Sequence, residues 1–415
     1  MSKKEIIIET KLVKVPTSKL AVGMYVSELD RPWLETSFTL QGFPLNSTKD
    51  IQSLRDICDF VYIDMLKSRF LPTESRQVFD EDLSQRVEYP LLSSVEKEIK
   101  QARPDYDNSL QEIHELLQRT HDGESIVVTT RRIRHCVKEC VASIERNPSA
   151  MMWLTRIKHV DAYTAEHCVN VGVLAISLGR HLGLKSNMLQ TLGLAGMLHD
   201  VGKMGLDQSI LNKPGRLTDE EFDHIKQHTV LGEKTLSEDP LLSHQVIETA
   251  LCHHERIDGR GYPQGISSKN LHLCTRIISI VDAYDAMTST RCYSKPKSTA
   301  TALKILYENT DTQFDGQLVV KFIECIGLYP PGCLLEMKSG EVGIVIASDP
   351  SARLLPRVAI ILSDEKQPTH PHIIDLKEQR KLPEGPQHHI KQVLPDGAFD
   401  IDLEAFTDRF DTYVK

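Results

Sequence analysis

The chain has 415 residues, too many for a single hydrophobic core, so its length predicts two or three domains. Its composition, 40% hydrophobic and 26% charged, is typical of a soluble globular protein. The net charge of −9 argues against a broad basic surface for binding DNA or anionic lipid.

The nine cysteines are scattered without a CxxC pair, and the N-terminus does not resemble a secretory signal. These features predict a cytoplasmic protein with free, mostly buried thiols. The longest apolar runs, such as VGVLAISLG, fall short of the roughly 20 residues that a membrane helix needs. We therefore expect no membrane span.

Three stretches with different patterns follow one another from the N-terminus. Residues 1–65 alternate short strand-like runs with turns around one helical stretch, STKDIQSLRDIC, and predict a small α+β module. Residues 66–107 are polar and rich in charge, which predicts a linker. Residues 108–330 repeat apolar residues at spacings of three and four, which predicts an all-helical domain with its core from about residue 150.

One helix of this domain has a clear start signal. In LTDEEFDHIKQH, Thr218 and Glu221 form a capping box directly before the apolar positions Phe222 and Ile225. We expect an amphipathic helix there.

After LYPPG the pattern becomes strand-like again. CLLEMKSGEVGIVIAS predicts a hairpin that turns at Ser339 and Gly340, and RVAIILS predicts a further strand. We expect residues 331–415 to form a small β appendage up to about residue 375, followed by a loosely patterned tail with an acidic terminal helix.

The strongest local signal for chemistry is MLHDVGK. On a helix, adjacent His199 and Asp200 could both bind a metal, and Lys203, one turn onward, could offer a cation to a phosphate oxygen. The alternative is an ordinary helix end, which the dipeptide alone does not exclude. Upstream, DAYTAEHCVNV places His167 at the start of an amphipathic helix, and downstream Asp282 ends an apolar run. Such residues are rarely buried without a partner or a metal, so we expect them to converge.

The order His, HD, Asp resembles the HD superfamily of metal-dependent phosphohydrolases. Three longer motifs, HDVGK, HTVLGEKTL and HHERIDGRGYP, are together similar to the HD-GYP family of bacterial cyclic di-GMP phosphodiesterases. The match runs from about residue 150 to 330. The stretch LAVGMYVSELDRPWLETSFTLQGF also resembles a module of unknown function that often precedes HD-GYP domains. The expected fold is therefore multidomain, with an α+β module, an all-α HD-type catalytic domain and a β appendage.

The resemblance implies seven metal ligands: His167, His199, Asp200, His228, His253, His254 and Asp282. Five imidazoles and two carboxylates are too many for one tetrahedral zinc, and mixed nitrogen and oxygen ligands suit Fe or Mn. A count of ligand positions fits two octahedral ions that share Asp200 and leave room for substrate. Some relatives hold a third metal through a Glu one turn before the first His, where this chain has Tyr163, so we predict two ions.

The implied reaction is hydrolysis of a phosphodiester by a hydroxide that two metals generate from water. The implied catalytic residues are Asp200, which would bridge the ions, and Lys203, which would bind a phosphate oxygen. Asp285, one turn after Asp282, is expected to orient a ligand.

The segment DGRGYP suggests a loop beside the metals that shapes the site or contacts a partner, or else only a tight turn. Gly259 and Gly261 permit backbone angles closed to other residues, and Tyr262 offers a ring and a hydroxyl. Farther on, TSTRCYSKPKS departs from the Arg-Pro-Tyr-Arg run common in the family, which leaves the purine preference open. The expected substrate contacts are Lys203, Arg291, Lys295, Tyr262 and Gly261.

The leading functional hypothesis is an enzyme that hydrolyses cyclic di-GMP to linear pGpG and onward to GMP. The alternatives are a phosphodiesterase for cyclic GMP-AMP, a non-catalytic scaffold that responds to a cyclic dinucleotide, and a nucleotide or alarmone hydrolase of the wider superfamily. The partners that the resemblance implies are the cyclic dinucleotide, a diguanylate cyclase and a second copy of the chain. The cyclase would bind through the DGRGYP segment, residues 258–263, called the GYP loop below.

Overall fold

A computed structural model of the chain describes all residues except 1–11, 21–23, 34–35, 37, 39–41, 46, 65–85, 158–162, 212, 214, 268–270, 290–295, 349–351, 381–387 and 410–415. The chain forms two compact units. One consists of Met1–Ser84 with Asp349–Leu355, and the other of Gln85–Ser348 with Pro356–Lys415. The predicted contacts Arg291 and Lys295 lie outside the described residues.

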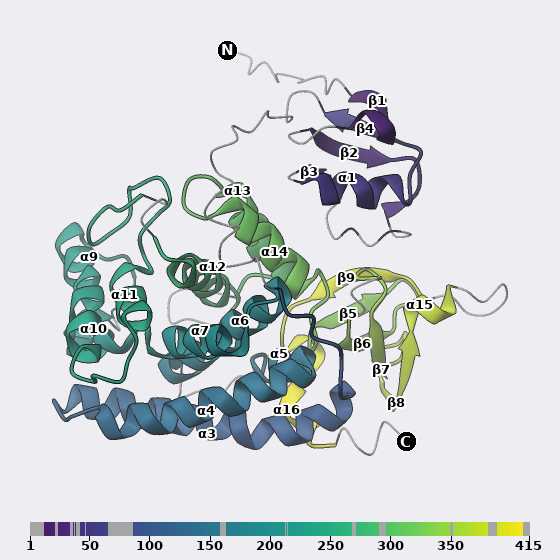
Figure 1. The fold of residues 1–415 in the computed structure, drawn as a ribbon. Helices are drawn as coiled ribbons and strands as arrows, with labels where there is room; N and C mark the ends of the chain where they lie inside the picture. The colour runs from purple at the N-terminus through teal and green to yellow at the C-terminus, as the bar shows by residue number, and fades with distance from the viewer. Residues whose placement is uncertain are drawn as a thin grey trace, which may run out of the picture. The chain divides into compact units, whose positions relative to one another are not determined.

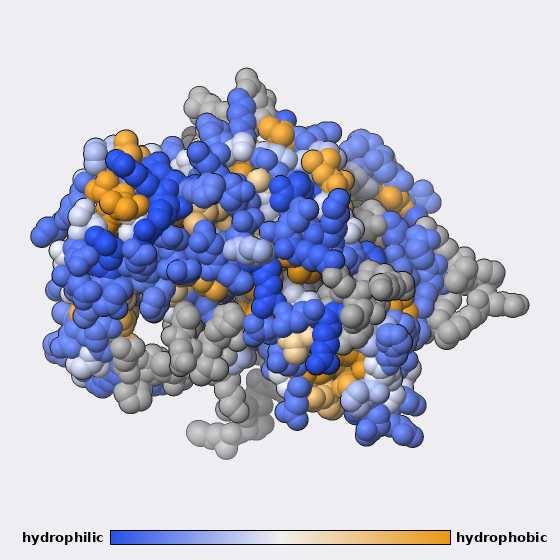
Figure 2. Space-filling model, turned by 90° about the horizontal axis from the view of Figure 1, so that it is seen from below, coloured by the Kyte–Doolittle hydropathy of each residue, from blue (hydrophilic) through white to orange (hydrophobic). Residues whose placement is uncertain are grey.

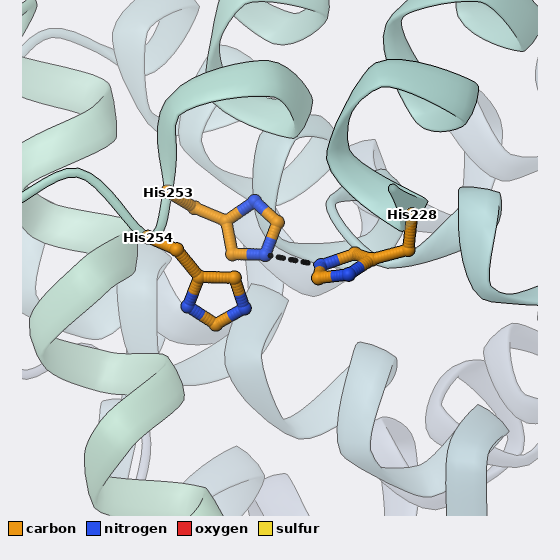
Figure 3. Close-up of side chains that lie close together, drawn as sticks. All are labelled: His228, His253 and His254. Atoms are coloured by element: carbon orange, nitrogen blue, oxygen red, sulfur yellow. Dashed lines mark hydrogen bonds between the residues drawn. The ribbon is translucent and has the colours of Figure 1, made fainter. Parts of the chain in front are cut away.

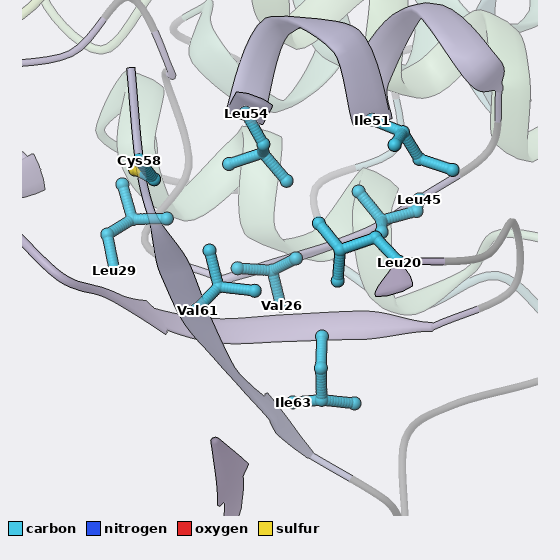
Figure 4. Packing of buried hydrophobic residues seen from close by; sticks show 9 residues of the cluster. All are labelled: Leu20, Val26, Leu29, Leu45, Ile51, Leu54, Cys58, Val61 and Ile63. Atoms are coloured by element: carbon cyan, nitrogen blue, oxygen red, sulfur yellow. The ribbon is translucent and has the colours of Figure 1, made fainter. Parts of the chain in front are cut away.

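The first unit is the α+β module that the sequence predicts. Its strands β1 (Leu12–Pro16), β2 (Tyr25–Leu29), β3 (Phe43–Pro44) and β4 (Phe60–Asp64) form an antiparallel sheet in the order β1-β4-β2-β3. Helix α1 (Thr48–Arg55) starts with a capping box and lies over the sheet. Figure 4 shows the core between them: Leu20, Val26, Leu29, Leu45, Ile51, Leu54, Cys58, Val61 and Ile63.

The second unit is mainly helical, as expected (Figure 1). Its helices are α3 (Val95–His121), α4 (Val127–Arg146), α5 (Pro148–Leu154), α6 (Tyr163–Leu182), α7 (Ser186–Leu198), η4 (Val201–Gly205), α8 (Gln208–Leu211), α9 (Asp219–Lys226), α10 (His228–Leu236), α11 (His244–Cys252), α12 (Leu273–Thr288), α13 (Thr299–Glu308) and α14 (Gly316–Ile326). The long helices α3 and α4 lie side by side, and α6 packs against α3, α4, α7 and α12.

Helix α6 is the centre of this unit and is not amphipathic, contrary to the sequence prediction. Every residue from 165 to 179 is buried, because other helices cover α6 on all sides. Its contact with α7 is especially close: a Cβ atom on Gly196 would lie 2.7 Å from the Gly172 Cα. These two glycines let α6 and α7 approach; α6 carries His167, and α7 leads directly into His199 and Asp200.

The predicted linker was wrong from residue 95 onward, because helix α3 begins there, with the Ser94 hydroxyl as its N-cap. The described residues before it are also tied to the helices: the Val87 amide donates to the Gly183 carbonyl at 2.8 Å. The apolar face of α3 is difficult to recognise in the sequence, because the helix has many charged residues and contains a proline, Pro104.

The C-terminal residues form a five-stranded antiparallel sheet in the order β8-β7-β6-β5-β9. Its strands are β5 (Leu334–Met337), β6 (Val342–Ala347), β7 (Arg357–Leu362), β8 (Pro368–Asp375) and β9 (Ile390–Leu394), and short helices α15 (Leu376–Gln379), η6 (Ala398–Asp400) and α16 (Leu403–Asp408) accompany them. The predicted hairpin is confirmed, and Gly340 in its turn has a φ of 97°.

The expectation of a loosely patterned tail was wrong. Strand β9 pairs with β5 and completes the sheet, and the expected terminal helix, α16, packs on the helical domain. There the Trp153 indole N–H donates to the Thr407 hydroxyl at 2.9 Å, and Arg103 pairs with Glu404 and Asp408. These contacts are between residues far apart in sequence, so local patterns do not predict them.

None of the helices in the described part of the chain is both long and apolar enough to cross a membrane. The face drawn in Figure 2 is mostly hydrophilic, with its hydrophobic residues in small separate groups. The cysteines in the described ranges are all free thiols.

Candidate metal centre

Five helices, α6, α7, α10, α11 and α12, meet at one buried site. Together they bring close all seven residues that the resemblance implies as ligands. His167 lies near the start of α6 and Asp282 lies within α12. The other five follow or begin helices: His199 and Asp200 come directly after α7, His228 begins α10, and His253 and His254 follow α11. Most are almost fully buried, and His254 and Asp282 are half-buried.

The Asp200 carboxylate lies between two groups of possible ligands. Its Oδ2 atom is 3.6 Å from His167 Nε2 and 3.2 Å from His199 Nε2. Its Oδ1 atom is 3.5 Å from His228 Nε2 and 3.7 Å from His253 Nε2. One carboxylate therefore presents a separate oxygen to each group.

Each group has the donor atoms of a metal site. His167, His199 and Asp282 offer ligand atoms that lie within 4.8 Å of one another, and so do His228, His253 and His254. Figure 3 shows the second group, in which the rings of His253 and His254 lie beside each other and His228 approaches His253 from another helix. Each group, together with the shared Asp200, could therefore hold a cation.

Backbone hydrogen bonds fix the orientation of the imidazole rings. The Nδ1 atoms of His199, His228 and His253 donate to the carbonyls of residues 196, 225 and 250, at 2.7, 2.7 and 3.0 Å. A carbonyl can only accept, so these rings carry their proton on Nδ1 and direct the Nε2 lone pair into the site. This is the usual way in which proteins prepare histidine for a metal.

The resulting arrangement fits a cation. His228 Nε2 and His253 Nε2 lie 3.3 Å apart, although neither carries a proton to donate. In the described structure, the buried atoms His199 Nε2 and Asp200 Oδ1 have no hydrogen-bond partner. Buried acceptors are costly without a donor or a cation, so the donor set suits metal ions.

The electrostatics of the second group favour neutral rings. Burial lowers the pKa of His228 to about 4 and that of His254 to about 3. Burial also lowers the pKa of His253 well below its usual value. Neutral imidazole is the form that binds a metal, so this group is ready at neutral pH.

The negative charge of the centre lies on two carboxylates, Asp200 and Asp282. Burial by itself would raise the pKa of the Asp200 carboxyl, but His199 and Lys203 hold it well below its usual value. Asp282 is likewise held low by His167, against the effect of burial. Burial lowers the pKa of His167, but hydrogen bonds with Asp282 and Asp285 prevail and raise it to about 9. Two ionised carboxylates in a buried site attract positive charge.

Asp285 holds His167 in position, as the sequence predicts. Its Oδ2 atom lies 2.8 Å from His167 Nδ1 and accepts from the Ser289 hydroxyl at 3.2 Å, while its Oδ1 accepts from the Asn170 amide at 3.2 Å. The Tyr106 hydroxyl in turn donates to Asn170 at 2.7 Å. Asn170 was not predicted from the sequence; its signal there is a polar residue three positions after His167 in an otherwise apolar run.

We predict that Asp285→Asn weakens metal binding about tenfold to a hundredfold, the usual effect of losing such a supporting carboxylate. An Asn amide can donate to His167 Nδ1, which would move the ring proton to Nε2 and block that ligand. Metal titration of the purified variant measures this. Glu98→Gln is the matched control, because Glu98 is a buried carboxylate paired with Arg146 away from the site; equal losses in both variants would contradict the proposed role.

Lys203 lies in the turn η4 directly after Asp200, and its ammonium is ion-paired with Asp200 Oδ2. The side chain is partly exposed, whereas Asp200 is almost fully buried. Lys203 therefore lies on the solvent side of Asp200.

The GYP loop folds back over the second group of histidines. The Tyr262 ring lies on the His254 ring, with centroids 4.8 Å apart and an angle of 33° between planes. Gly259 has a φ of 74°, as expected of a turn glycine. Gly261 has a different reason from the predicted one: its φ is not positive, but a Cβ atom there would lie 2.4 Å from the Arg256 amide nitrogen.

Glu255, which was not predicted as a functional residue from the sequence, holds this loop. Its buried carboxylate accepts hydrogen bonds from the backbone amides of Gln264, Gly265 and Ile266 at 2.7, 3.0 and 3.0 Å. Three backbone donors on one carboxylate make a rigid anchor. Its only sequence signal is a charged residue directly after the histidine pair.

Comparisons with known proteins agree with this site. A family model described as HD domain matches residues 140–318, which include all seven residues of the centre, and one described as Domain of unknown function (DUF3391) matches residues 12–130. The chain is 35% identical over 371 residues to a protein of Pseudomonas aeruginosa named cyclic di-GMP phosphodiesterase. The matched region covers 88% of this chain and 89% of that protein. The chain belongs to the HD-GYP family.

Other relatives of this HD-GYP protein match shorter stretches of it. It is 36% identical over 166 residues to a cyclic di-GMP phosphodiesterase of Thermotoga maritima, and this match covers 40% of the chain and 45% of that protein. It is 34% identical over 177 residues to the 3'3'-cGAMP-specific phosphodiesterase 3 of Vibrio cholerae, and this match covers 42% of the chain and 38% of that protein. Two related dinucleotides are therefore named among the substrates of its relatives.

Proposed function

We propose that this chain is a metal-dependent phosphodiesterase that hydrolyses cyclic di-GMP to linear pGpG and onward to GMP. The observation that carries the proposal is the position of Asp200, whose two carboxylate oxygens face two separate groups of possible ligands. The name and the extent of the Pseudomonas relative support the substrate.

The metal ions that we propose are two divalent transition ions, Fe or Mn. His167, His199 and Asp282 would hold one ion, His228, His253 and His254 the other, and Asp200 both. The mixture of imidazole and carboxylate ligands supports Fe or Mn over Mg and Ca, which prefer oxygen ligands only. When bound, such a pair would supply Lewis acidity, which lowers the pKa of water and offsets the charge that builds up on phosphorus. The Tyr163 side chain lies outside the described residues, so the choice of two ions over three stays a prediction.

The remaining residues orient the substrate. Asp200 is buried and fixed between the two groups, so it holds the reacting region in one geometry. Lys203, at the exposed edge, would bind a non-bridging phosphate oxygen through its ammonium group. Tyr262 would form one wall beside His254, and Gly261 would keep the loop close enough to do so. Arg291 and Lys295 stay predicted substrate contacts.

A second candidate, hydrolysis of cyclic GMP-AMP, has the Vibrio relative in its favour. The altered RCYSK run, where the family often has Arg-Pro-Tyr-Arg, also keeps this candidate open. The diguanylate cyclase partner and the second copy of the chain stay predictions.

The test of the proposed function is hydrolysis by protein purified without oxygen and reconstituted with Mn²⁺ or Fe²⁺. Chromatography of the products should show pGpG formed from cyclic di-GMP, and a parallel reaction with cyclic GMP-AMP ranks the two substrates. A metal-loaded protein that binds either dinucleotide but forms no product would instead support a non-catalytic scaffold.

A further inference from the structure

An exposed aromatic ring lies next to the GYP loop. Phe222 is an apolar residue in the first turns of the capped helix α9, and the predicted capping box is present, but Phe222 is 45% exposed. A single exposed apolar residue is ordinary on a protein surface. The position of Phe222 is what distinguishes it, because it contacts the residue that covers a candidate ligand.

Three rings lead from the metal centre to the surface. The His254 ring lies under the Tyr262 ring, and Tyr262 and Phe222 form a T-shaped pair, with ring centroids 6.2 Å apart and planes at 80°. Phe222 is therefore two ring contacts away from a candidate metal ligand. A nucleobase is separated from its phosphate by a sugar, so a base on Phe222 is compatible with a phosphate at the centre.

A cation accompanies the rings. Lys226 lies one helical turn after Phe222, and its ammonium is 4.6 Å from the Phe222 ring centroid and 5.9 Å from that of Tyr262. Its ion pair with the exposed Asp223 is 2.7 Å long, a type of contact that is weak in water and easily exchanged. An aromatic face with an adjacent movable cation is the combination that binds a base and its phosphate.

The scaffold holds this surface firmly. Helix α9 is followed directly by α10, whose first residue is His228, so the platform and the second ligand group share one segment. On the other side, Glu255 anchors the loop that carries Tyr262. A preorganised surface loses little freedom when a ligand binds.

We propose that Phe222, Lys226 and Tyr262 form a nucleobase platform on which one purine of the cyclic dinucleotide stacks while a phosphate lies at the metal centre. This inference rests on the proposed function and adds Phe222 and Lys226 to the substrate contacts. Stacking contributes equally to the substrate and to its transition state, so it affects KM and leaves kcat unchanged.

The experiment compares Phe222→Ala, Phe222→Trp and wild type in steady-state hydrolysis and in direct binding of cyclic di-GMP. Phe222→Ala should raise both KM and Kd about tenfold to a hundredfold at nearly constant kcat, the range expected for loss of one base–aromatic stack. Phe222→Trp should keep wild-type affinity. Cyclic di-UMP, whose smaller bases stack less strongly, should lose less affinity in Phe222→Ala than cyclic di-GMP does.

Phe399→Ala is the matched control, because Phe399 is a similarly exposed phenylalanine, 49% exposed, with the Lys366 ammonium 5.6 Å from its ring centroid in the C-terminal region. Equal KM and Kd values for Phe222→Ala and Phe399→Ala would overturn the platform. If wild type hydrolyses cyclic di-GMP in that case, the proposed function survives. Binding that depends on Phe222 without hydrolysis would keep the platform and overturn the phosphodiesterase, and a wild type that neither binds nor hydrolyses would overturn both.

Discussion

Asp200→Ala is expected to lower the hydrolysis of cyclic di-GMP by at least about a thousandfold, because a pair of metals that acts together contributes several kcal/mol to the transition state. The same variant should bind less metal, since it removes the only carboxylate that faces both ligand groups among the described residues. Elemental analysis and product chromatography on the same sample measure both effects.

The control for Asp200→Ala is Asp122→Ala, which removes an exposed carboxylate at the end of α3. It should keep both metal and activity. Substantial turnover by Asp200→Ala at wild-type metal content would contradict a bridging role for this carboxylate.

Lys203→Met should separate activity from metal binding. We expect kcat to fall about a hundredfold, the effect of removing one positioned charge from a developing anion, while the metal content stays at the wild-type level. The metal is retained because Lys203 is paired with Asp200 Oδ2 and would compete with a cation for that oxygen. Kinetics at saturating substrate and metal analysis test the two halves of this prediction.

Lys304→Met serves as the comparison for Lys203→Met, because it removes an exposed lysine of α13 whose nearest carboxylate is Glu308. It should behave as wild type. A Lys203→Met enzyme that loses metal in proportion to its activity would assign Lys203 a structural role instead of a substrate contact.

The set of residues at the centre could be predicted from the sequence because metal ligands must be particular residue types in a particular order. Histidines and aspartates inside apolar helical runs are costly, and seven of them matched one family pattern. The helical pattern also placed His167 near the start of its helix, where the structure has it. The pairwise arrangement around Asp200 could not be predicted, since it depends on how α7, α10 and α11 pack in space.

Other features depend on contacts between distant segments and left weak signals in the sequence. Glu98 is buried in α3, where Arg146 neutralises it, so a charged position belongs to the core. Phe222 occupies an apolar position of a capped helix and yet faces solvent next to Tyr262. Strand β9 joins its sheet only because β5 offers an edge. In each case the partner decides the outcome, and the partner is far away in the chain.

The most direct measurement of the central claim is a metal titration of the metal-free protein, followed by the rate of cyclic di-GMP hydrolysis. If Asp200 joins two ions into one catalytic centre, activity should stay low up to one equivalent of Mn²⁺ and rise between one and two equivalents. Full activity at a single equivalent, or none after two are bound, would contradict the two-metal centre.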